Sequence, residues 1–155
     1  MGQVGRVGQV GRVGQVGRVP PGTRFALWRD MLLRHHTLIA WQRADDLFIE
    51  LHALSRSAFP AYERFELGSQ TRRSAFSVAV NIVEGCAREH EGEKLQFFNV
   101  ARASLAEVGY CIHVAHRLDY IDAQQLDQLE VKIKRTSAAL NGYIRSIRTG
   151  ATPSP

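Results

Sequence analysis

Apolar residues recur every three or four positions in four stretches of the chain, which is the spacing of one face of an α-helix. The pattern predicts helices over residues 38–57, 66–87, 93–118 and 122–148. The third stretch approaches the heptad spacing of left-handed bundle packing, through Leu95, Phe98, Ala101, Leu105, Val108, Ile112 and Ala115. Outside the N-terminal repeat, no stretch alternates strongly with a period of two. We therefore predict an all-α protein, an antiparallel up-down-up-down four-helix bundle.

Residues at the ends of these stretches support the predicted boundaries. Pro60 follows the first stretch, and proline is incompatible with a helix interior. Gly85 is a predicted weak point near the end of the second helix, and Gly92 marks the turn into the third. Asp122 is a predicted N-cap, and Gln125 is its capping-box partner.

The N-terminal region has a different composition from the rest of the chain. The hexapeptide Gly-Gln-Val-Gly-Arg-Val occurs three times between residues 2 and 19, and Pro-Pro-Gly follows. Such a Gly-rich stretch is costly to order and has few groups to bury. We expect residues 1–30 to be a disordered tail with Met31 as a candidate start, residues 31–149 to form the bundle, and residues 150–155 to fray. The rival interpretation is a basic arm that contacts phosphate.

The net charge of +5 is unevenly distributed. Residues 1–30 contain five arginines and one aspartate, a net +4, whereas residues 31–155 contain fifteen Lys/Arg and fourteen Asp/Glu, a net +1. The predicted bundle is therefore close to neutral. Most of the basicity that could attract nucleic acid lies in the tail.

Several features point to a cytoplasmic protein. No stretch approaches the roughly 18 consecutive apolar residues of a membrane span, and the N-terminus lacks the apolar region of a secretory signal. Two cysteines, Cys86 and Cys111, make neither a disulfide framework nor a zinc site. We expect both to be free thiols that pack as small residues in a reducing compartment.

Polar residues form a second stripe along the second predicted helix, beside its apolar face. The members of this polar stripe recur at three- and four-residue steps: Gln70, Arg73, Ser77, Asn81, Glu84 and Arg88. Because Asn and Ser are weak helix formers, their presence here indicates a partly buried hydrogen-bonded network, within or between subunits. Glu107 on the third helix is a candidate partner for Arg72 or Arg73, since a buried charge needs one. A binding site for a ligand or nucleic acid is the alternative.

The sequence carries little that indicates enzyme chemistry. Catalysis needs a nucleophile beside a base, or paired carboxylates, and Glu84 and Glu107 have no histidine with them on the stripe. There is no P-loop, no dinucleotide-binding fingerprint and no G-x-S-x-G sequence. His113 and His116 share a helix face and could join Asp119 in a metal site, but we expect ordinary surface or interface histidines. We predict no enzyme activity, no cofactor and no metal.

Two runs of the sequence carry a family signature. Residues 68–88 read GSQTRRSAFSVAVNIVEGCAR, and residues 97–107 read FFNVARASLAE. They resemble the S-Q-x-R-R-A-x-x-S-x-x-x-N-I-x-E-G-x-x-R and F-L-x-x-A-x-G-S-x-x-E sequences of the four-helix-bundle proteins encoded in 23S rRNA intervening sequences. The resemblance covers residues 38–148. It departs from the family at Ser74, usually Ala, at Ala79, where Pro is common, and at Ala103, usually Gly.

The resemblance implies a bundle that assembles into a ring-like homopentamer. A related branch is the accessory variability determinant protein of diversity-generating retroelements, which binds a reverse transcriptase and nucleic acid through a basic surface. We therefore expect a non-enzymatic, self-assembling bundle that acts as a scaffold or accessory factor.

Two other functions stay open. One is a nucleic-acid-binding accessory protein, with RNA, DNA or a reverse transcriptase as its partner. Its contacts would be basic residues of the fourth helix: Lys132, Lys134, Arg135, Arg145 and Arg148. A symmetric assembly would multiply any such basic patch. The other is an enzyme with a site in the bundle core.

Overall fold

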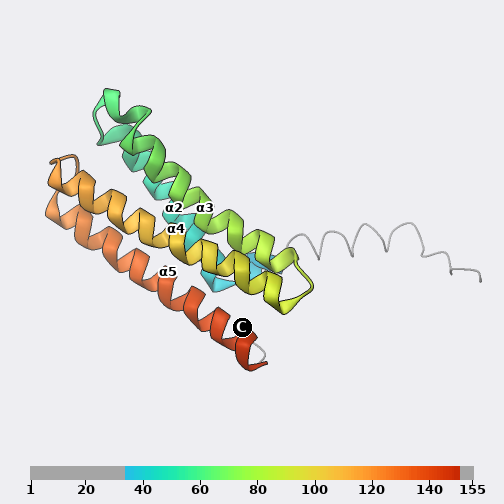
Figure 1. The fold of residues 1–155 in the computed structure, drawn as a ribbon. Coiled ribbons are helices and arrows are strands. Elements are labelled where there is room, and N and C mark those ends of the chain that lie inside the picture. The colour runs from blue at the N-terminus through green and yellow to red at the C-terminus, as the bar shows by residue number, and fades with distance from the viewer. Residues whose placement is uncertain (1–33, 151–155) are drawn as a thin grey trace, which may run out of the picture.

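The computed structural model describes residues 34–150, which form four long α-helices (Figure 1). The helices are α2 (Ile39–Ser57), α3 (Leu67–Ala87), α4 (Glu91–Arg117) and α5 (Ala123–Thr149), with short 3-10 helices η1 (Arg34–Thr37) and η2 (Ala61–Arg64). Each long helix packs against the next along the chain, and α5 also packs against α2. This order of contacts confirms the predicted antiparallel up-down-up-down bundle.

Residues 1–33 and 151–155 lie outside the described part of the chain. The hexapeptide-repeat tail, the candidate start at Met31 and most of the C-terminal tail therefore stay predictions. Gly150 follows α5 with a φ of 64°, the left-handed conformation that commonly ends a helix. No helix within residues 34–150 is long and apolar enough to cross a membrane.

The apolar faces of the four helices meet in one core. Its most completely buried large side chains come from every long helix: Leu47, Leu51, Val78, Ile82, Phe98, Val108, Ile112, Leu129 and Leu140. Burying one such side chain contributes roughly 1.5–3 kcal/mol relative to leaving it exposed. Because this burial follows the apolar period of the sequence, the predicted and observed helix ends differ by no more than two residues.

Local sequence signals set the helix ends, with one correction. The Asp122 carboxylate accepts a hydrogen bond from the Gln125 N–H at 2.7 Å, and Gln125 Oε1 accepts one from the Asp122 N–H at 3.0 Å. The predicted capping box of α5 is thus confirmed. The prediction that Gly92 lies in a turn is wrong, because α4 already begins at Glu91. Glu91 and Glu93 suit that first turn, since the N-terminal end of a helix favours negative charge.

Helices α3 and α4 are the most extensively packed pair, and a glycine allows their close approach. A Cβ atom on Gly85 would lie 2.7 Å from Cε1 of Phe98, so only glycine leaves room for that ring. Phe98 is fully buried and packs edge-on against Tyr143 of α5, with ring centroids 5.2 Å apart. The expectation that Gly85 is a weak point is therefore corrected: it is a point of tight helix packing.

Side chains fasten the connection between α2 and α3. Arg72 of α3 donates hydrogen bonds to Ser55 Oγ at 3.1 Å and to the Arg64 carbonyl at 2.7 Å. Glu63 in η2 accepts a hydrogen bond from the Tyr120 hydroxyl at 2.9 Å. Because Tyr120 lies between α4 and α5, the two connections at this end of the bundle are held together.

Candidate interaction surface

The polar stripe of α3 borders the line of contact between α3 and α4. Ser77 Oγ and Ser104 Oγ lie 2.9 Å apart, and Asn81 Nδ2 donates to the Ser77 carbonyl at 2.7 Å and to its hydroxyl at 3.0 Å. Ser104 is buried, while Ser77 and Asn81 are half-buried. Gln70 donates a hydrogen bond to the Glu107 carboxylate. The Ser77–Ser104 and Gln70–Glu107 hydrogen bonds link the two helices at fixed register.

The charged members of the stripe face solvent. Arg73, Glu84 and Arg88 are all exposed. The Arg88 guanidinium lies 4.7 Å from the centroid of the Phe97 ring, within cation–π range. Arg73 makes no hydrogen bond or ion pair with the residues that the structure describes. Its guanidinium is therefore available to a partner outside the subunit.

The predicted pairing of Glu107 with Arg72 or Arg73 is wrong. Glu107 accepts its hydrogen bond from Gln70 instead. Arg72 turns toward α2 and η2, on the opposite flank of α3 from the polar stripe, and Arg73 is exposed. The prediction assumed a buried carboxylate, but Glu107 is exposed, so it does not require a charged partner.

A buried cysteine lies behind the stripe. Cys111 is buried, and neither it nor Cys86 forms a disulfide bond within residues 34–150. Burial raises the pKa of the Cys111 thiol, and hydrogen bonding with Thr71 and Ser74 partly opposes that shift. Among the described residues, every buried side-chain nitrogen or oxygen has a hydrogen-bond partner. No unpaired buried polar group in this part of the chain calls for a ligand.

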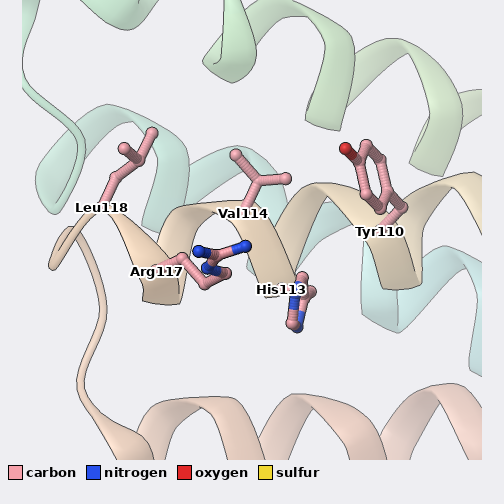
Figure 2. A pocket seen from close by; sticks show the side chains of 5 residues that line it. All are labelled: Tyr110, His113, Val114, Arg117 and Leu118. Atoms are coloured by element: carbon pink, nitrogen blue, oxygen red, sulfur yellow. The ribbon is translucent and has the colours of Figure 1, made fainter.

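A hollow surface lies where α4 ends, beside the start of α3. Figure 2 shows Tyr110, Val114 and Leu118 pointing from α4 toward α3, while His113 points toward α5 and Arg117 lies between them. These five side chains line a pocket of about 310 Å³. Residues 110, 114 and 118 are four positions apart, so they form one face of α4 outside its core-facing stripe.

An adjoining open hollow of about 710 Å³ extends this surface across the start of α3. It shares Val114 and Leu118 with the first pocket and adds Phe65 and Arg73. Phe65, Tyr110 and Leu118 are 85%, 69% and 48% exposed. We call this combined surface the aromatic groove; it is defined by Phe65, Arg73, Tyr110, Val114, Arg117 and Leu118. The sequence predictions included only Arg73. The four-residue spacing was the signal for Tyr110, Val114 and Leu118, whereas Phe65 follows η2 and had no such signal.

Helices α2 and α3 together carry a second set of exposed apolar side chains. Ile49 and Phe76 are 60% and 53% exposed. Phe48 packs edge-on against Phe76 with ring centroids 5.5 Å apart, and Val80 lies one turn further along α3. We call this surface the apolar ridge; it is defined by Phe48, Ile49, Phe76 and Val80. None of its residues belongs to the polar stripe.

Two of the five predicted basic contacts on α5 are neutralised by carboxylates. Lys132 forms an ion pair with Glu50 of α2. Lys134 forms one with Glu130, one turn earlier in α5, at 2.9 Å. Exposed pairs of this kind contribute little to stability, but they reduce the positive charge that α5 presents.

The other three basic residues of α5 do not join into one patch. Arg135 lines a pocket with Arg43 on the α2 side of the helix. The two paired lysines are also separated, because a step of two residues rotates a helix position by roughly 200° and places Lys134 on the opposite flank of α5 from Lys132. Arg145 and Arg148 are exposed near the C-terminal end. The structure therefore spreads the predicted nucleic-acid contacts over α5.

The structure does not assemble the alternative metal site of His113, His116 and Asp119. His113 lines the pocket beside Arg117, whereas His116 Nδ1 lies 3.1 Å from the Ile121 carbonyl oxygen. Asp119 sits in the turn after α4 with a φ of 57°. Within residues 34–150, no three His, Cys, Asp or Glu side chains are grouped closely enough to hold a metal ion.

The model of the 23S rRNA-intervening sequence protein family matches residues 36–142. The match spans α2, α3, α4 and most of α5, so the chain belongs to this family. No curated protein sequence matches the chain significantly. The matched region contains the polar stripe, the apolar ridge and the aromatic groove, and ends before Arg145 and Arg148.

Proposed function

We propose that this member of the 23S rRNA-intervening sequence protein family is a non-enzymatic bundle that assembles with copies of itself and acts as a scaffold or accessory factor. The observation that carries the proposal is the apolar ridge. Ile49 and Phe76 expose large apolar side chains, and Phe76 packs against Phe48 rather than standing alone, as in the clustered apolar surfaces that mark interaction sites. Burial of this surface against another subunit would remove it from water.

The polar stripe has a supporting role in this proposal. Its hydrogen bonds run between α3 and α4 of one subunit, through the Ser77–Ser104 and Gln70–Glu107 contacts. They fix the register of the two helices, and hence the relative position of the exposed surfaces on either side of α3. A ring-like homopentamer is the assembly that the family signature implies.

Light-scattering mass of the purified full chain tests this proposal. We expect a discrete multiple of the 17.4 kDa subunit mass. The absorbance ratio at 260 and 280 nm across the same peak reports co-purifying nucleic acid. A mass of one subunit at all concentrations up to those in the cell would reject self-assembly.

A second candidate is a nucleic-acid-binding accessory factor, with RNA, DNA or a reverse transcriptase as partner. Arg145 and Arg148 support it, because both are exposed on α5 and make no ion pair within the described chain. A symmetric assembly would repeat the two charges in every subunit. Affinity that falls steeply with salt and weakens in Arg145→Glu/Arg148→Glu would support contact through α5. Salt-independent or absent binding would reject this candidate.

A further inference from the structure

The aromatic groove and the apolar ridge differ in chemistry, although both border α3. The ridge offers mainly aliphatic and aromatic carbon. The groove places the exposed rings of Phe65 and Tyr110 near two exposed guanidinium groups, those of Arg73 and Arg117. Arginine beside flat aromatic rings suits a partner that carries both negative charge and planar groups.

Two acidic side chains, Glu63 and Glu66, also line the open hollow. Glu63 accepts a hydrogen bond from the Tyr120 hydroxyl, which fixes its position but leaves it charged. Glu66 is exposed at the rim, so both carboxylates would oppose an anionic partner at that end of the groove. Neither groove arginine forms an ion pair with a carboxylate in the described chain. Two guanidinium groups that lack an ion-pair partner among the described residues therefore border the groove, together with these two carboxylates.

We infer that the aromatic groove binds single-stranded nucleic acid, with unpaired bases stacked on Phe65 and Tyr110 and backbone phosphates contacted by Arg73 and Arg117. The inference rests on the nucleic-acid-binding candidate above and moves its contact surface from α5 to the groove. Exposed rings can stack only on bases that are free of a duplex, which selects single strands.

The dimensions of the groove agree with this partner. Tyr110 and Arg117 are two helical turns apart on α4, roughly 10 Å along the axis. Val114 and Leu118 lie on the same side of α4 as Tyr110 and provide an apolar floor (Figure 2). Arg73 lies across the groove on α3. A short run of nucleotides can therefore meet both rings and both arginines.

The test is fluorescence anisotropy of the full chain with an unstructured single-stranded RNA of about 15 nucleotides and with a duplex of the same length. We expect Arg73→Glu/Arg117→Glu to weaken single-strand binding about tenfold or more. The slope of log affinity against log salt should fall by about 1.4, because each phosphate contact on a single strand contributes about 0.7.

A second variant separates stacking from charge. Phe65→Ala/Tyr110→Ala retains every charge, so it should abolish the preference for single strand over duplex and leave the salt slope unchanged. This readout is independent of the five arginines in residues 1–30, which can contact phosphate in either form of RNA. Glu66→Gln should strengthen binding, since it removes the opposing charge at the rim.

The matched control is Arg145→Glu/Arg148→Glu, which makes the same charge change at exposed arginines of α5. It should cost clearly less affinity than the groove variant, and circular dichroism should show native melting for all variants. Equal losses in both arginine variants, or a loss confined to the α5 variant, would overturn the groove but keep nucleic-acid binding. Absence of RNA binding would overturn both and leave self-assembly standing. Dissociation of the assembly by the groove variant, with unchanged RNA affinity, would make the groove a contact between copies.

Discussion

At the scale of single residues, Gly85 decides how closely α3 and α4 pack. In Gly85→Ala the new methyl group would lie 2.7 Å from the Phe98 ring, which is fully buried and has Tyr143 behind it. The ring has little room to retreat, so we expect a loss of about 1–3 kcal/mol of unfolding free energy. Urea denaturation followed by circular dichroism measures it.

Gly142→Ala is the matched control, because no heavy atom lies within 4 Å of the new Cβ. The substitution replaces an exposed glycine inside α5 and should raise the free energy of unfolding by about 0.5–1 kcal/mol. Equal effects of the two substitutions would show that helix propensity, rather than the contact with Phe98, governs Gly85.

Cys111 gives a second residue-scale prediction, concerning pH. Burial raises its thiol pKa, so the native state keeps the proton while the unfolded state releases it. The stability that depends on the protonated thiol is present at neutral pH and is lost as pH rises through the thiol range, roughly pH 8 to 10. In Cys86→Ser, where Cys111 is the only thiol, iodoacetamide should react far more slowly with native than with urea-unfolded protein. Similar rates in both states would contradict this.

At the scale of elements, two neighbouring arginines of α3 have different roles: one holds elements of the fold together and the other faces solvent. Arg72 joins α3 to Ser55 and to the Arg64 carbonyl, whereas Arg73 is exposed and unpaired within the described chain. Arg72→Met should therefore lower the unfolding free energy by about 1–3 kcal/mol, since two hydrogen bonds of a charged group are lost. Arg73→Met should change it by less than about 0.5 kcal/mol. Chemical denaturation compares them directly; an equal loss at Arg73 would mean that it is bonded within the fold.

The helices could be predicted from the sequence because each one places an apolar residue on its core-facing side at every turn, and this spacing is visible in the sequence alone. The capping box at Asp122 was equally accessible, since both of its partners lie within one turn of sequence. The sequence offered no comparable signal for η2, whose position depends on Arg72 and Tyr120, contacts that span 8 and 57 residues. Local spacing carries no information about such distances.

The candidate site was only partly predictable for the same reason. Helical spacing placed Ser77 and Asn81 correctly on one line, but it gave no rotamers, and so it paired Glu107 with the wrong residue. It also treated the cations of α5 as one group, although Lys132 meets Glu50 from a helix more than 80 positions earlier. Phe65 lies between helices, where an apolar period has no meaning.

At the scale of the whole molecule, the described bundle separates two kinds of surface on either side of α3. The ridge is suited to burial against protein, and the groove to a charged, planar partner. The near-neutral charge of residues 31–155 means that neither surface gains much from long-range attraction. If either proposed surface binds a partner, short-range contacts must therefore supply most of the affinity.

The proposed assembly through the ridge would make unfolding depend on protein concentration. If native subunits associate and unfolded ones do not, the apparent Tm must rise with concentration. Ile49→Ser/Phe76→Ser should lower the light-scattering mass toward 17.4 kDa and remove this dependence, because each apolar side chain buried at a contact contributes about 1.5–3 kcal/mol. Val131→Ser, at a residue 45% exposed on α5, is the control and should change neither property. An unchanged mass in the ridge variant would place the subunit contact on another face, and the ridge would then need a different partner to cover it.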